Sequence, residues 1–169
     1  LQVGHVERFN SAFQAIKDIV SNARFIECHR LSPFSGRSTD IGVVLDLMIH
    51  DIDIMLGLIK SQIKNIQAVG VKVLTSHEDI ANARIIFRNG CVCNLTASRI
   101  SPEAMRKIRL FLKNSYISLD YIKQEAFLYK KEKDKITRDL LPIETEEPLK
   151  KEIESFIDCI INKNKQLVS

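Results

Sequence analysis

Short segments with the alternating pattern of β-strands recur between residues 24 and 131. In one of them, the dipeptide Asn89-Gly90 separates two alternating runs. This predicts a hairpin with a two-residue type I′ turn, because both turn positions of that type require a positive φ. About six or seven strands in one continuous sheet are predicted in all. The segments are residues 24–34, 63–75, 82–99, 106–113, 116–122 and 125–131.

Three further segments repeat apolar residues at the spacing of an amphipathic helix. They are residues 11–22, 41–59 and 146–163, and residues 132–145 are expected to form a charged connection. The predicted fold class is therefore α/β (α+β), with a large, mostly antiparallel open sheet and helices packed on one face.

The side chains on the two faces of the predicted hairpin indicate whether the protein self-associates. A two-residue turn would place apolar side chains on both faces, so that neither face is cleanly polar. Three helices of this length can cover only one side of the sheet. Since large exposed apolar patches are rare on soluble monomers, we expect a homo-oligomer, a dimer or a tetramer, formed through the uncovered face. The two predicted faces are Ile85, Phe87 and Val92 against Ile86, Cys93 and Leu95.

Charge and composition narrow the class of protein. The net charge of +4 is mild and the lysines alternate with acidic residues, so we expect no nucleic-acid partner. No apolar run reaches the roughly 20 residues that span a bilayer, so we expect no membrane segment. The four cysteines lie in strand-like or helical runs, as free thiols of reducing compartments do, which favours a cytoplasmic protein.

One of the predicted helices carries a short polar stripe on an otherwise apolar surface. Asp46 and His50 are four residues apart, and Asp53 follows three residues later. At about 100° per residue these three side chains point the same way. Polar groups on an apolar helix are costly to bury unless they are paired. The stripe therefore needs either a structural partner or a substrate.

Residue types alone leave three interpretations of the stripe open. Asp46 and His50 can form an ion pair on the helix surface. Carboxylate and imidazole groups also suit zinc or iron, although no further His or Cys falls at ligand spacing. The third interpretation is proton transfer, because an imidazole titrates near neutral pH and an adjacent carboxylate can orient it.

The loop before this helix contributes two features. Thr39 or Asp40 is expected to cap the helix by accepting a bond from a free backbone N–H. Arg37 stands beside Gly36 and could clamp a phosphate or a carboxylate. The simpler interpretation of Arg37 is a solvent-exposed loop residue.

Three segments, in the same order, are similar to motifs of one known family. The motif Asp46-x-x-x-His50-x-x-Asp53 resembles the helix motif of the Gfo/Idh/MocA oxidoreductases, which are NAD(P)-dependent enzymes acting on sugars and cyclitols. Residues 3–10 resemble the junction between the nucleotide-binding domain and the second domain of that family. Residues 147–156 resemble its late amphipathic helix.

The resemblance implies that part of the enzyme lies outside this chain. Residues 1–10 would be the junction, and residues 11–169 the C-terminal substrate and oligomerisation domain, ending before a final helix. The nucleotide-binding half would precede them and carry the catalytic lysine. None of the six glycines of the chain forms the G-x-G-x-x-G motif of a dinucleotide site. NAD or NADP would then be bound mainly elsewhere, and this chain alone is expected to be inactive.

By the same resemblance, the whole enzyme would oxidise or reduce a ring hydroxyl or carbonyl of a sugar or nucleotide sugar. Asp46 and His50 would be the catalytic residues, with His50 as the acid/base and Asp46 orienting it or sharing the proton. Asp53 would hold the His50 ring or the helix in place. No cofactor-binding residue and no metal ligand is expected in this chain. Further candidates for substrate contacts are Arg8, Asn10 and Arg37.

Two other classes of function remain open. A non-catalytic scaffold or regulatory module would keep the fold without the chemistry. The presence of Asp46 and His50 counts against that class, and the missing nucleotide-binding half counts for it. A metal-dependent lyase or hydrolase is the more distant alternative.

Overall fold

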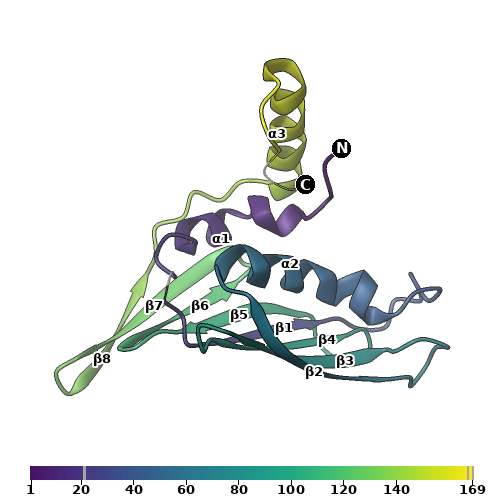
Figure 1. Cartoon of the computed structure of the whole chain (residues 1–169), viewed down its shortest axis with the longest axis horizontal. Coiled ribbons are helices and arrows are strands. Elements are labelled where there is room, and N and C mark those ends of the chain that lie inside the picture. The colour runs from purple at the N-terminus through teal and green to yellow at the C-terminus, as the bar shows by residue number, and fades with distance from the viewer. Residues whose placement is uncertain (21, 167, 169) are drawn as a thin grey trace.

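Eight strands form one sheet in the computed structural model, which describes residues 1–20, 22–166 and 168 (Figure 1). Their order across the sheet is β2-β3-β4-β1-β5-β6-β7-β8. Among these strands β1 and β4 are parallel neighbours and the other neighbours are antiparallel, which confirms the predicted mostly antiparallel sheet. The strands are β1 (Phe25–Leu31), β2 (Ile63–Val71), β3 (Ile80–Phe87), β4 (Val92–Ser98), β5 (Met105–Phe111), β6 (Ser115–Asp120), β7 (Glu125–Glu132) and β8 (Lys135–Leu140).

The sheet has one strand more than the predicted six or seven. Strand β8 pairs with β7 and forms one edge of the sheet. Its residues are mostly polar and almost all exposed, because this edge strand has a single neighbouring strand. The expectation of a charged connection over residues 132–145 is therefore wrong for residues 135–140.

The hairpin between β3 and β4 has a three-residue loop, not the predicted two-residue turn. Residues 88–90 form the loop, and Gly90, with a φ of 86°, donates its N–H to the Phe87 carbonyl. Cys93 consequently pairs with Ile85 and lies on the same, covered face. The prediction that both faces are apolar is therefore wrong, because most outward side chains of β3 and β4 are polar. Those outward side chains are Ile80, Asn82, Arg84, Ile86, Val92, Asn94 and Thr96.

Helices cover one face of the sheet, as predicted (Figure 1). Helices α1 (Ser11–Ile16) and α2 (Ile49–Leu58) lie over this face, and a π-helical turn, η2 (Val44–Met48), leads directly into α2. A short 3-10 turn, η1 (Val6–Phe9), leads into α1. The last helix, α3 (Pro148–Asn162), stands away from the sheet, next to the N-terminus (Figure 1).

The start of the η2–α2 helix is stabilised differently from the prediction. Neither Thr39 nor Asp40 caps it, because the helical backbone begins later in the sequence. The carboxylate of Glu78, from the loop between β2 and β3, accepts a bond from the Val44 N–H at 3.4 Å. Gly42 permits this approach, since a Cβ there would overlap the Glu78 carboxylate. A cap supplied from so far along the chain leaves no local signal in the sequence.

Three other boundaries differ from the predicted ones by a few residues. Strand β2 ends at Val71, because the backbone N–H groups of residues 73–75 donate to the Asp79 carboxylate and leave the ladder. Strand β1 ends at Leu31, shortly before a proline that has no N–H to donate. Helix α1 ends at Ile16, where the chain turns toward β1.

The core lies between the helices and the covered face of the sheet. Among the described residues, no helix is long and apolar enough to cross a membrane. The largest fully buried core side chains include Ile16, Ile26, Ile54, Met55, Phe87, Leu95, Ile108, Leu110, Ile117 and Leu119.

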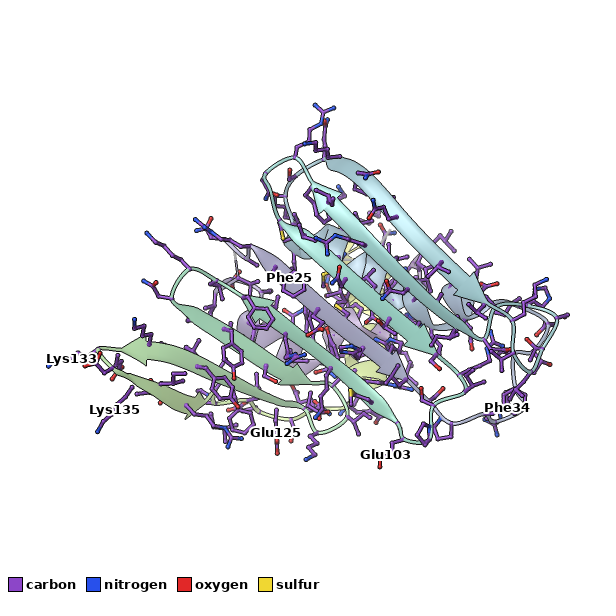
Figure 2. All side chains as sticks on the ribbon, turned by 90° about the horizontal axis from the view of Figure 1, so that it is seen from below. Phe25, Phe34, Glu103, Glu125, Lys133 and Lys135 are labelled. Atoms are coloured by element: carbon purple, nitrogen blue, oxygen red, sulfur yellow. The ribbon has the colours of Figure 1, made fainter. Side chains whose placement is uncertain are left out.

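The opposite face of the sheet is not covered by the helices (Figure 2), and it carries a row of aromatic side chains beside a more polar row. One row consists of four cross-strand neighbours whose ring centroids lie 5.6, 5.4 and 4.2 Å apart. The next row contains the ion pair between Glu27 and Arg109. The aromatic row is Phe25, Phe111, Tyr116 and Tyr129.

Candidate active site

The N-terminal segment lies alongside α2 and pairs two of its side chains with that helix. The Nδ1 atoms of His5 and His50 are 3.4 Å apart. One turn further along α2, Arg8 donates to both carboxylate oxygens of Asp53, at 2.5 and 3.0 Å, and to its carbonyl at 2.9 Å. His50 and Asp53 therefore share one side of α2, as their spacing predicts. Asp53 thus joins α2 to the N-terminal segment through Arg8, and among the described residues no hydrogen bond links its carboxylate to the His50 ring.

The two imidazole rings meet edge to face. Their centroids are 5.5 Å apart and their planes are inclined at 86°. Burial, the Arg30 guanidinium and the neighbouring His5 lower the pKa of His50 below its ordinary value of 6.5, and they outweigh the opposite effect of Asp51 and Glu7. The half-buried His50 is thus a neutral imidazole near pH 7, the form that can accept a proton.

A buried ion cluster next to His50 joins three elements of the fold. Arg30 of β1 donates to Asp51 of α2 from Nε at 3.0 Å and from Nη2 at 2.9 Å, and to Glu7 of η1 from Nη1 at 3.1 Å. Burial alone would lower the pKa of Arg30, but the two carboxylates raise it above its ordinary value. The cluster fixes α2 against the sheet and against η1, and this determines where the neighbouring His50 lies.

Asp46 lies in the π-helical turn, one turn before His50. A π-helical turn winds more widely than an α-helical one, so a spacing of four residues there does not stack the two side chains as in a regular α-helix. The Asp46 side chain is half-buried, and among the described residues no ion pair joins it to His50. Its carboxylate is therefore available to a ligand or to solvent.

The three candidates for substrate contacts are Arg8, Asn10 and Arg37, and they do not lie in one place. Asn10 is buried, its Oδ1 accepts the Ala12 N–H at 3.0 Å, and its Nδ2 lies 3.4 Å from the Tyr121 carbonyl. The side chains of Asn10 and Arg8 thus form hydrogen bonds to other residues of the chain. Arg37 is exposed in the loop before η2.

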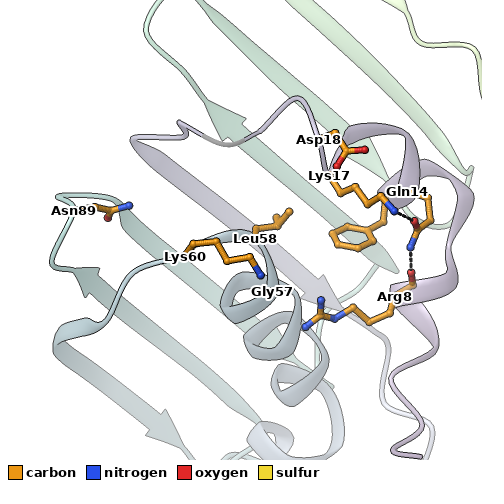
Figure 3. A pocket seen from close by; sticks show the side chains of 9 residues that line it. Arg8, Gln14, Lys17, Asp18, Gly57, Leu58, Lys60 and Asn89 are labelled. Atoms are coloured by element: carbon orange, nitrogen blue, oxygen red, sulfur yellow. Dashed lines mark hydrogen bonds between the residues drawn. The ribbon is translucent and has the colours of Figure 1, made fainter. Parts of the chain in front are cut away.

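A cavity of 610 Å³ opens between α1 and the end of α2 (Figure 3). Lys17 donates to Gln14 at 2.7 Å, and Gln14 in turn donates to the Arg8 carbonyl. Lys60 and one acidic residue, Asp18, also line this cavity. The excess of positive charge suits an anionic group.

Sequence reasoning missed four residues of this site, and two of them left a signal. Arg30 occupies an inward position of β1, where the alternation predicts an apolar side chain. Asp51 similarly stands as a buried charge within an apolar helix. His5 and Glu7 left no such signal, because residues 1–10 show no strand or helix pattern in which a polar residue would stand out.

The arrangement offers a proton acceptor and a free carboxylate within one turn of the same helix segment. It does not fit the pyrophosphate of a dinucleotide, because the described residues contain no Gly-rich loop between a strand and a helix N-terminus. Nor do these residues bring together three or more His, Cys, Asp or Glu side chains in a group that could hold a metal ion.

A family model, a curated protein and a solved structure all point to the same family. Residues 5–117 match the family model described as the GFO/IDH/MocA C-terminal domain. The chain is similar to UDP-N-acetylglucosamine 3-dehydrogenase of Acidithiobacillus ferrooxidans, with 35% identity over 167 residues that cover 95% of this chain and 53% of that protein. A solved structure of that dehydrogenase is similar at a TM-score of 0.90 and 33% identity, covering 98% of this chain and 54% of the other. The chain thus spans about half the length of these relatives.

A more distant solved structure shares the fold. It is an oxidoreductase from Agrobacterium radiobacter in complex with NAD+, L-tartaric acid and magnesium. The two chains are 16% identical with a TM-score of 0.77, and the match covers 100% of this chain and 57% of the other. At this identity the likeness concerns the fold alone.

Proposed function

The chain belongs to the GFO/IDH/MocA family, and from this membership we propose that it forms the C-terminal half of a nicotinamide-dependent dehydrogenase acting on a ring hydroxyl of a sugar nucleotide. The substrate we expect is UDP-N-acetylglucosamine, because the relative that is 35% identical is named as its 3-dehydrogenase. NAD or NADP would be bound mainly by the other half of the enzyme.

The observation that carries the proposal is the position of His50, whose half-buried imidazole lies on α2 within the part of the chain that matches the family model. Its pKa is lowered and its ring is half-buried, so it can accept the proton of a substrate hydroxyl near neutral pH. The carboxylate of Asp46, one turn earlier, would bind the same sugar. The nicotinamide, when bound, supplies the acceptor for the hydride.

The ion pairs around the helix would keep these two groups in place. Arg8 holds Asp53 and Arg30 holds Asp51, so α2 is fixed at two points, one residue and three residues after His50. Because a catalytic base must stay within hydrogen-bond reach of its proton, a rigid helix favours this chemistry.

Turnover by the whole protein tests the proposal. We expect reduced nicotinamide to form when UDP-N-acetylglucosamine and NAD+ or NADP+ are added, as measured by absorbance. The 169-residue chain alone is the control: calorimetry should show at most weak binding of NAD(H), because it lacks the phosphate-binding loop. A folded whole protein that reduces neither cofactor with any sugar nucleotide would favour a non-catalytic module instead.

We also propose that the chain forms a homo-oligomer through the open face of its sheet. The side chains of the aromatic row are half-exposed and already packed against one another, so a second copy could cover them with little loss of side-chain freedom. Light scattering should report a dimer or a tetramer. Phe111→Asp should shift it to a monomer, whereas Phe34→Asp, in an exposed loop, should not. A monomeric mass for the unaltered protein would contradict this proposal.

A further inference from the structure

The backbone holds His5 in a fixed position beside α2. Its N–H donates to the Val3 carbonyl at 2.9 Å, and its own carbonyl accepts the Arg8 N–H at 2.9 Å. Glu7 and Phe9, which follow in η1, are buried. The His5 imidazole is therefore not carried on a loose terminal segment, and its contact with His50 is a built feature of the site.

The carboxylates beside His50 on α2 are occupied by other partners. Both oxygens of Asp51 and both oxygens of Asp53 accept hydrogen bonds from arginines. Glu7 likewise accepts from an arginine. Among the described residues, the group within hydrogen-bond distance of the His50 ring is the imidazole of His5. If the base is oriented by a third group, as catalytic bases commonly are, that group is His5.

A contact between two Nδ1 atoms restricts the tautomers of both rings. One ring must donate and the other accept, because a neutral imidazole has one N–H and one lone pair. If His5 donated, His50 would accept at Nδ1 and carry its proton on Nε2, so neither of its nitrogens could take a proton from a substrate. If His50 donates from Nδ1, its Nε2 keeps a free lone pair.

We propose that His5 is a positioning residue whose Nδ1 accepts the Nδ1–H of His50, fixing the tautomer in which Nε2 of His50 is the base. This inference rests on the proposed function, which requires His50 to accept a proton. When the substrate O–H bond breaks, its proton moves to Nε2 of His50 and the electron pair stays on the substrate oxygen. The resulting imidazolium keeps its hydrogen bond to His5, which stabilises the positive charge.

Nitrogen-15 NMR of the histidine rings tests the tautomer without turnover. In the 169-residue chain, labelled at the histidine side chains and held near neutral pH, His50 should show a protonated Nδ1 and an unprotonated Nε2. His5 should show the reverse. The chain has four histidines, so single substitutions to glutamine assign the signals. A His50 ring protonated at Nε2 would overturn the inference.

Kinetics of two variants of the whole enzyme test the role itself. His5→Phe keeps a ring but removes the acceptor, and should lower kcat on the order of 10²-fold with KM nearly unchanged. His5→Asn keeps an acceptor oxygen close to the Nδ1 position and should recover most of the lost kcat. A His5→Phe enzyme that keeps wild-type kcat would overturn the role. If the wild type shows no turnover, the proposed function fails, and the tautomer measured by NMR still decides the inference about His5.

Discussion

Arg30→Met is expected to lower the free energy of unfolding by about 3–5 kcal/mol. The guanidinium neutralises two carboxylates that are almost fully buried, with 8% of the Glu7 side chain and 7% of the Asp51 side chain exposed. Methionine fills a similar volume but leaves both charges without a partner in a region of low dielectric. Urea unfolding of the wild type and the variant measures the difference.

An exposed arginine on the same sheet provides a matched control. Arg109 forms an ion pair with Glu27, but 49% of its side chain is exposed. Arg109→Met should therefore cost less than about 1 kcal/mol. Removing all three charges together, in Glu7→Gln/Arg30→Met/Asp51→Asn, should restore part of the stability lost in Arg30→Met. If Arg30→Met and Arg109→Met lowered the free energy of unfolding by similar amounts, the buried cluster would stabilise the fold no more than an exposed ion pair does.

His50→Ala in the whole enzyme is expected to lower kcat on the order of 10²-fold or more, because the base that takes the hydroxyl proton is removed. Asp46→Asn should also lower kcat strongly while the protein stays folded, since the amide keeps the shape of the carboxylate but not its charge. Steady-state kinetics with the sugar nucleotide measure both effects.

His29→Ala is the control for these two variants. His29 lies half-exposed on the open face of the sheet, away from the helices, so its loss should leave kcat unchanged. Thermal unfolding should show that all three variants remain folded. If His50→Ala and Asp46→Asn both turn over at near the wild-type rate, the polar stripe has a structural role and the proposed mechanism fails.

Local sequence patterns predicted most of the sheet, because strand alternation and helical spacing are properties of short segments. The sequence pattern was insufficient where the same residues suit two different local structures. An Asn-Gly pair suits a two-residue turn, but Gly90 satisfies the positive φ of a three-residue loop equally well. The one-residue difference moved Cys93 to the covered face and removed the original argument for an apolar open face. Strand β8 was missed because an exposed edge strand does not need an apolar row.

The candidate site was predictable only as far as it lies on one helix. Asp46, His50 and Asp53 stand within a few residues of each other, so their spacing was informative. Their partners come from segments that are distant in the sequence. Arg30 reaches the site from β1 and His5 from the N-terminal segment. The alternation of β1 marks Arg30 as a buried charge, but no pattern within either segment reveals which residues these side chains contact.

The pH dependence of kcat/KM tests the central claim that His50 is the base most directly. A neutral imidazole is required, so activity should be retained as the pH falls until the pKa of His50 is reached, and should be lost below it. Because burial, Arg30 and His5 lower that pKa, the acid limb of the wild-type profile should lie below pH 6.5. In His50→Gln the residual activity should show no such limb. An acid limb that persists unchanged in His50→Gln would contradict the claim.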